Sequence, residues 1–142
     1  MKSKNLLLVI LFVMFASINS KVFAQNGPVV YFCVKYDSEG DGEVDISDRF
    51  TTGAITVVVK SGSAIGLTDC FIQYDKYNQS KKKFEYYKKF EFEIGESSKY
   101  VYFAKTKNND MAFEEPGIYR VYLLNAKEKV VSSSLVEIVE RD

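Results

Sequence analysis

The sequence of 142 residues contains no histidine and no tryptophan, and it has only two cysteines and two prolines. Without histidine the chain cannot build Ser-His-Asp or Cys-His catalytic groups, and it lacks the commonest protein ligand for zinc and copper. It also has no glycine-rich phosphate-binding loop with the lysine that such loops require. These absences exclude several large enzyme classes, and we predict that the protein is not an enzyme.

The two cysteines, Cys33 and Cys70, leave three interpretations open. Disulfide bonds persist in exported proteins, and one bridge between these positions would stabilise the fold by roughly 3–4 kcal/mol. Alternatively, both residues are small buried thiols. A catalytic thiol is the least favoured interpretation, because no histidine is available to activate it.

The first 24 residues have the layout of a cleavable secretory signal. Lys2 and Lys4 precede an apolar run over residues 6–16, and Val22-Phe23-Ala24 places small or modest residues before Gln25. The apolar run is shorter than the roughly 20 residues that a membrane-spanning helix needs. We therefore predict a signal peptide over residues 1–24, a mature domain over residues 25–142 without a membrane span, and a periplasmic or extracellular location.

The charge of the chain is balanced, with 19 basic and 19 acidic residues. The predicted signal peptide contains three lysines, Lys2, Lys4 and Lys21, and no acidic residue, so the mature chain has a net charge of −3. A mildly acidic domain is not expected to bind nucleic acid as its main partner. The sequence leaves the oligomeric state open.

Apolar residues recur with a period of two along the mature chain, which is typical of β-strands. The alternation is sharpest over residues 90–94, whereas residues 100–104 and 118–124 are apolar on both faces and predict strands covered on both sides. Strands are expected over residues 30–36, 53–60, 70–75, 90–94, 100–104, 118–124 and 135–139. Short strands with frequent turns predict an all-β sandwich or barrel.

A Pro-Gly turn at Pro116-Gly117 leads into a strand that carries Tyr119 and Tyr122. The pattern over residues 117–140 resembles the turn and strand that precede the last hairpin of bacterial immunoglobulin-like domains. The resemblance implies a single immunoglobulin-like antiparallel β-sandwich of about seven strands. It also implies that Tyr119 or Tyr122 acts as a corner tyrosine whose hydroxyl bonds back to the backbone. Because the chain has no tryptophan, we expect a generic sandwich and not an antibody-type domain.

Residues 37–48 read DSEGDGEVDISD and match the spacing of a calcium-binding loop. In such loops oxygen ligands at alternate positions surround the cation, a glycine allows a sharp turn, and a last carboxylate closes the coordination shell. The stretch resembles the calcium loops of EF-hand and dockerin proteins. That resemblance implies calcium ligands at Asp37, Glu39, Asp41, Glu43, Asp45 and Asp48.

The surroundings of this loop differ from those in the two families. A β-branched strand is expected after it, where EF-hands and dockerins have a helix, and the chain has one such loop where dockerins have two. No dockerin function is therefore inferred. The alternative is a solvated acidic turn, since Asp, Gly and Ser are common turn residues. Calcium bound here would stabilise the domain and would not take part in chemistry.

Residues 80–89 mix lysines with aromatic residues. One interpretation is a surface that binds a glycan or polyanion by stacking and charge, with contacts from Lys82, Phe84, Tyr86 and Tyr87. The other is a hairpin with a lysine-rich outward face. The sequence as a whole predicts a secreted or periplasmic, non-enzymatic binding module with a protein or glycan partner. The alternative is a calcium-stabilised structural domain of a cell-surface assembly.

Overall fold

The computed structural model describes residues 27–141, and the predicted signal peptide over residues 1–24 lies outside them. Every regular secondary-structure element in the described part of the chain is a β-strand. The strands are β1 (Val29–Asp37), β2 (Gly42–Ser47), β3 (Arg49–Thr51), β4 (Gly53–Ala54), β5 (Thr56–Lys60), β6 (Asp69–Asn78), β7 (Lys83–Glu93), β8 (Tyr100–Phe103), β9 (Ala112–Phe113), β10 (Gly117–Asn125) and β11 (Val130–Val139). No helix that could cross a membrane is found within residues 27–141.

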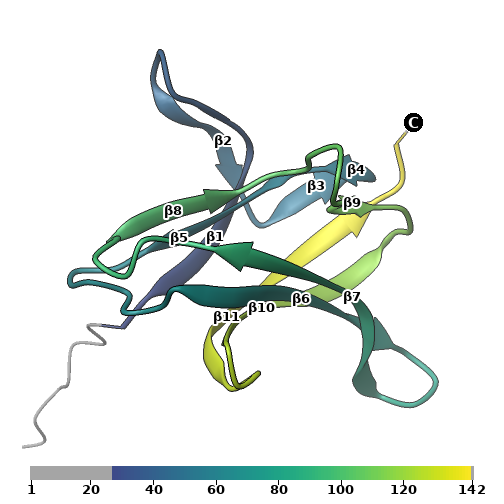
Figure 1. Cartoon of the computed structure of the whole chain (residues 1–142). Helices are drawn as coiled ribbons and strands as arrows, with labels where there is room; N and C mark the ends of the chain where they lie inside the picture. The colour runs from purple at the N-terminus through teal and green to yellow at the C-terminus, as the bar shows by residue number, and fades with distance from the viewer. Residues whose placement is uncertain (1–26, 142) are drawn as a thin grey trace, which may run out of the picture.

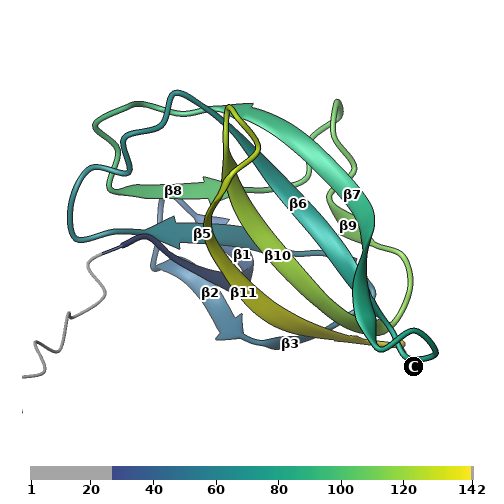
Figure 2. The ribbon, with the colours of Figure 1, turned by 90° about the horizontal axis from the view of Figure 1, so that it is seen from below.

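The strands form two main sheets that pack face to face (Figures 1 and 2). The four-stranded sheet has the order β2-β1-β5-β8, and the five-stranded sheet has the order β3-β11-β10-β6-β7. A short pair, β4 with β9, lies at one end of the sandwich. All pairings are antiparallel except that of β3 with β11, which is parallel. This architecture is an immunoglobulin-like antiparallel β-sandwich, as the sequence predicts.

The core lies between the inner faces of the two sheets. Alternate residues of each long strand point inward, as the period-two pattern requires. The four-stranded sheet contributes residues such as Phe32 and Val57, and the five-stranded sheet contributes Ile72 and Val121. The connection between β8 and β10 adds Phe113, whose ring stacks on that of Tyr74 with centroids 4.4 Å apart. Aromatic residues therefore fill much of the interior, which is consistent with their abundance in the sequence.

A corner tyrosine is present at the start of β10. The Tyr119 side chain is fully buried, and its hydroxyl donates a hydrogen bond to the Glu115 carbonyl oxygen at 2.8 Å. The carbonyl belongs to the residue four positions earlier, at the turn before the strand. This geometry confirms the predicted corner and assigns it to Tyr119, because Tyr122 lies on the opposite face of β10.

Each of the seven strand segments predicted from periodicity overlaps a strand of the sandwich. These strands are β1, β5, β6, β7, β8, β10 and β11. Two predictions about coverage were wrong. Residues 118–124 and 100–104 were expected to be covered on both faces, yet Ile118 and Tyr102 are among the exposed large hydrophobic residues. No described element covers the outer face of β10, and β8 is an edge strand.

Candidate functional site

The outer face of the five-stranded sheet carries a group of apolar and aromatic side chains around Arg120, three of which are exposed. We call this group the aromatic stripe and define it as Phe84, Tyr86, Ile118, Arg120 and Leu135. Tyr86, Ile118 and Leu135 are 65%, 42% and 48% exposed. Such exposure of large apolar side chains on one sheet face is typical of a surface that contacts another molecule.

The strand register places these residues next to one another across the sheet. Tyr86 of β7 is opposite Asp75 of β6, Asp75 is opposite Arg120 of β10, and Arg120 is opposite Leu135 of β11. Directly opposite residues share a face of the sheet. A continuous row therefore crosses four strands, with an aromatic residue at one end and an aliphatic residue at the other.

Arg120 is held over an aromatic ring within this row. Its guanidinium carbon lies 4.4 Å from the centre of the Phe84 ring, and the Phe84 ring meets that of Tyr77 at 5.2 Å. A guanidinium stacked on a ring keeps free N–H donors at its edges and is the kind of group that proteins use in interfaces. The neighbouring Asp75 accepts a hydrogen bond from the Gln73 side chain at 2.8 Å.

The structure separates the four surface residues predicted from the sequence. Phe84 and Tyr86 lie on the outer sheet face, opposite Tyr77 and Asp75. A bulge in the β6–β7 register falls between them and Lys88, and Tyr87 packs inward against the Tyr119 ring at 5.3 Å. Lys82 lies in the hairpin turn with a φ of 52°. The structure therefore brings together Phe84 and Tyr86 and leaves Tyr87 and Lys82 elsewhere.

Ile118, Arg120 and Leu135 were not singled out by sequence reasoning. Their positions alternate with buried neighbours, so the signal was present in the period-two pattern. Both faces of residues 118–124 are apolar, which predicts that both faces are covered, although one of them is open in the structure. Whether a face is covered depends on strand order, and strand order cannot be inferred from local periodicity.

The acidic stretch 37–48 forms the turn and second strand of the β1–β2 hairpin, which projects from the sandwich (Figure 1). Asp37 Oδ1 accepts a hydrogen bond from the Glu39 backbone N–H at 3.1 Å. Asp45 has a φ of 55°, a left-handed conformation that Asp tolerates better than most residues. No three histidine, cysteine, aspartate or glutamate side chains between residues 27 and 141 gather in the way a metal site requires. Calcium binding by the six residues stays a prediction from spacing.

One residue of the acidic stretch, Glu43, bonds to a side chain outside the stretch. Glu43 accepts a hydrogen bond from the Tyr31 hydroxyl, and this bond, more than any other cause, lowers the pKa of the Glu43 carboxyl. Burial and the Glu43 carboxylate raise the pKa of both Tyr31 and Tyr100. The ring of Tyr36 stacks on that of Tyr102 at 4.2 Å beside them. These contacts tie the base of the hairpin to the outer face of the four-stranded sheet.

Both cysteines are buried and free. Cys33 is opposite Thr56 and lies outside the group of core residues between the sheets, whereas Cys70 belongs to that group. The Cys33 thiol contacts the Lys35 carbonyl oxygen at 3.3 Å. Burial raises the pKa of Cys33, and it raises that of Cys70 to about 11. This geometry favours the interpretation of two inert buried thiols.

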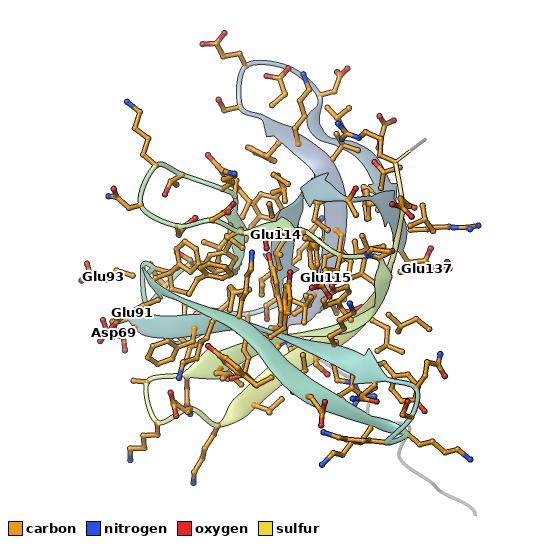
Figure 3. The ribbon with its side chains drawn as sticks, turned by 90° about the vertical axis from the view of Figure 1, so that its right-hand side faces the viewer. Asp69, Glu91, Glu93, Glu114, Glu115 and Glu137 are labelled. Carbon is orange, nitrogen blue, oxygen red and sulfur yellow. The ribbon has the colours of Figure 1, made fainter. Side chains whose placement is uncertain are left out.

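The neighbouring carboxylates of the sequence do not form an acid–base pair across a cleft. Figure 3 shows Asp69, Glu91 and Glu93 together at one edge of the sandwich, away from Glu114 and Glu115. Glu114 is 3.1 Å from the Lys88 ammonium group, and Glu115 pairs with Lys76. The lysine beside Glu115 lowers the pKa of that carboxyl. A general acid needs a raised pKa, so this arrangement does not fit glycoside hydrolysis.

Comparison with known proteins finds a similarity in structure and none in sequence. No protein-family model matches the chain, and no curated protein matches it. An immunoglobulin-like protein from Pseudomonas aeruginosa has a related structure, with 11% sequence identity and a TM-score of 0.44. The alignment covers 82% of this chain and 99% of that one.

Proposed function

We propose that this protein is an exported, non-enzymatic interaction module that binds a partner protein through the aromatic stripe. The observation that carries the proposal is the row from Tyr86 through Arg120 to Leu135, which leaves aromatic and aliphatic side chains exposed on one sheet face. Tyrosine and arginine are the residues that most often dominate protein interfaces. Export is supported by the signal-like N-terminal sequence.

A protein partner is favoured over a glycan by the composition of the stripe. Sugar rings stack on broad exposed aromatic faces, and Tyr86 alone among the five residues is both aromatic and exposed. Ile118 and Leu135 offer aliphatic surface, and a shallow groove that includes both borders the stripe on the β3 side. Aliphatic side chains with one central arginine suit the apolar core and polar rim of a protein interface.

The proposal is tested with a photo-crosslinking amino acid at position 86 in the protein produced in its source cells. The matched control places the same amino acid at position 102, which is exposed on the other sheet. We expect one discrete crosslinked partner from position 86 and none from position 102. Arg120→Ala should then weaken binding of the purified partner by about 30-fold, the effect of a residue worth roughly 2 kcal/mol.

Two results of these experiments would contradict the proposal. Equal crosslinking from positions 86 and 102, or unchanged affinity in both Arg120→Ala and Leu135→Asp, would show that the stripe is not the interface. Circular dichroism and thermal unfolding of each variant establish that the fold is kept. The alternative role as a calcium-stabilised structural domain rests on the spacing of residues 37–48 and is tested separately.

A further inference from the structure

The strand β11 has a free edge over its first half. On one side it pairs with β10 along most of its length, but on the other side β3 pairs only with Glu137, Ile138 and Val139. Within residues 27–141, no strand lies against Val130–Leu135 on that side. The edge is therefore open over six residues, which corresponds to roughly 20 Å of extended chain.

Hydrogen bonds at the paired end of β11 show which residues point toward this edge. The Glu137 N–H donates to the Asp48 carbonyl oxygen at 2.8 Å, and the Val139 carbonyl oxygen accepts from the Thr52 N–H at 2.9 Å. Alternate residues of a strand direct their N–H and C=O groups to the same side. Ser133 and Leu135 therefore present their backbone groups to the open edge, and both residues are exposed.

A groove of about 430 Å³ lies beside this edge. Its other wall is the start of β1, which runs close to β11 (Figure 2). β2 begins to pair with β1 only at Phe32, so β1 is open on this side as well. The groove is lined by Gly27, Pro28, Val29, Val30, Val130, Val131, Ser132, Ser133 and Ser134.

The lining of the groove is uncharged and combines valines with serines and backbone groups. None of its residues is charged, and Val29 and Val130 are 56% and 60% exposed. A charged ligand would lose its hydration here without gaining a counter-charge. A backbone with unpaired N–H and C=O groups is complemented best by another backbone in extended form.

We propose that this groove binds an extended, uncharged peptide segment of a partner protein, which pairs with Ser133 and Leu135 as an added β-strand. Main-chain hydrogen bonds to β11 supply affinity. Alternate apolar side chains of the segment pack on Val29 and Val130. The site meets the aromatic stripe only at Leu135, whose backbone belongs to the strand edge and whose side chain lies on the outer sheet face beside Arg120. The groove itself opens between the sheets, and none of its lining residues belongs to the stripe.

The test is selection of binders from an unrestricted heptapeptide library displayed on phage, with the purified protein as target. We expect enriched peptides to be uncharged, with apolar residues at alternate positions. Ser133→Pro removes an N–H that points away from β10 and places a ring in the edge, so it should weaken these peptides at least about ten-fold while the fold is kept. Ser133→Ala keeps the N–H and should bind as the unchanged protein does.

A second measurement leaves the protein unaltered. A selected peptide is synthesised with N-methyl groups at alternate residues in each of the two phases. One phase should lose binding and the other should retain it, because only one set of amides faces β11. Tyr86→Ala, on the aromatic stripe, should leave peptide affinity unchanged, which keeps this site distinct from the proposed partner surface.

Three results would overturn the proposal. The first is that no heptapeptide is enriched, and the second is that binding is insensitive to both Ser133→Pro and N-methylation. The third is self-association of the protein that Ser133→Pro abolishes, which would assign the edge to a second copy of this chain.

Discussion

The Tyr119 hydroxyl donates a hydrogen bond to the Glu115 carbonyl oxygen, and this bond fixes the turn before β10 to the strand itself. The ring of Tyr119 is fully buried against Phe113, with centroids 4.8 Å apart. We expect Tyr119→Phe to lower the free energy of unfolding by about 1–2 kcal/mol, because the carbonyl loses its partner while the ring stays in place. Urea unfolding measures this. Tyr122→Phe, on the outer face of the same strand, is the matched control and should cost less than about 0.5 kcal/mol.

Gly117 lies two residues before Tyr119, and a side chain there should strain the backbone. Its φ is 150°, and a Cβ built there would lie 2.9 Å from the Lys76 Cε atom. Backbone of this kind is reached almost only by glycine, so Gly117→Ala should destabilise the fold by about 1–3 kcal/mol. Gly62→Ala is the control, since nothing lies within 4 Å of its Cβ position. Equal unfolding midpoints for the two variants would contradict this account.

The fold was predictable from sequence because its main signals are local. The period-two pattern marks the strands, and the Pro116-Gly117 turn followed by Tyr119 marks the corner. The contacts that make the aromatic stripe are not local. Arg120 meets Phe84 only because β10 and β7 flank β6, and Tyr87 turns inward only because a bulge shifts the β6–β7 register. Register and strand order depend on the whole sandwich, so neither contact could be inferred from a single segment.

Strand pairing in the acidic stretch could not be inferred from its sequence either. The ligand-like spacing predicts a loop, yet residues from Gly42 onward pair with β1 as β2. Pairing of Tyr36 with Glu43 and of Lys35 with Val44 fixes the carboxylates on a hairpin. A sequence template records which residue types are present, and it does not record how the backbone around them is paired.

The free cysteines lead to a direct prediction. Because Cys33 and Cys70 are unpaired, the protein purified without reductant should show two reactive thiols in denaturant. In the native state both should react slowly, since burial raises their pKa values and the thiolate is the reactive form. Ellman's reagent measures both states. Finding no thiol in denaturant would instead establish the disulfide, and reductant would then lower the melting temperature.

The Tyr31–Glu43 hydrogen bond predicts a specific pH dependence. The bond lowers the pKa of Glu43 in the folded protein, so its stabilising effect is complete above the unfolded pKa of about 4.3 and is lost as pH falls through the folded value. Tyr31→Phe should therefore be less stable than the unchanged protein at pH 7, and the difference should narrow at pH 3. Tyr102→Phe is the control, because the pKa of Glu43 does not depend on it. If the difference in unfolding free energy between Tyr31→Phe and the unchanged protein is the same at both pH values, this role of the hydrogen bond is contradicted.

The calcium hypothesis for residues 37–48 has an equally direct test. Thermal unfolding is measured with EDTA and then with millimolar calcium for the unchanged protein and for the double variant Asp37→Ala, Asp41→Ala. A ligand that binds only the folded state adds roughly 2.7 kcal/mol at 100 times its dissociation constant, so calcium binding predicts a rise of several degrees that the double variant lacks. The double variant Glu91→Ala, Glu93→Ala removes the same charge at another edge and should keep the rise. Identical midpoints in EDTA and calcium would leave DSEGDGEVDISD as the turn and strand of a hairpin, anchored by Glu43 to Tyr31 and needing no metal.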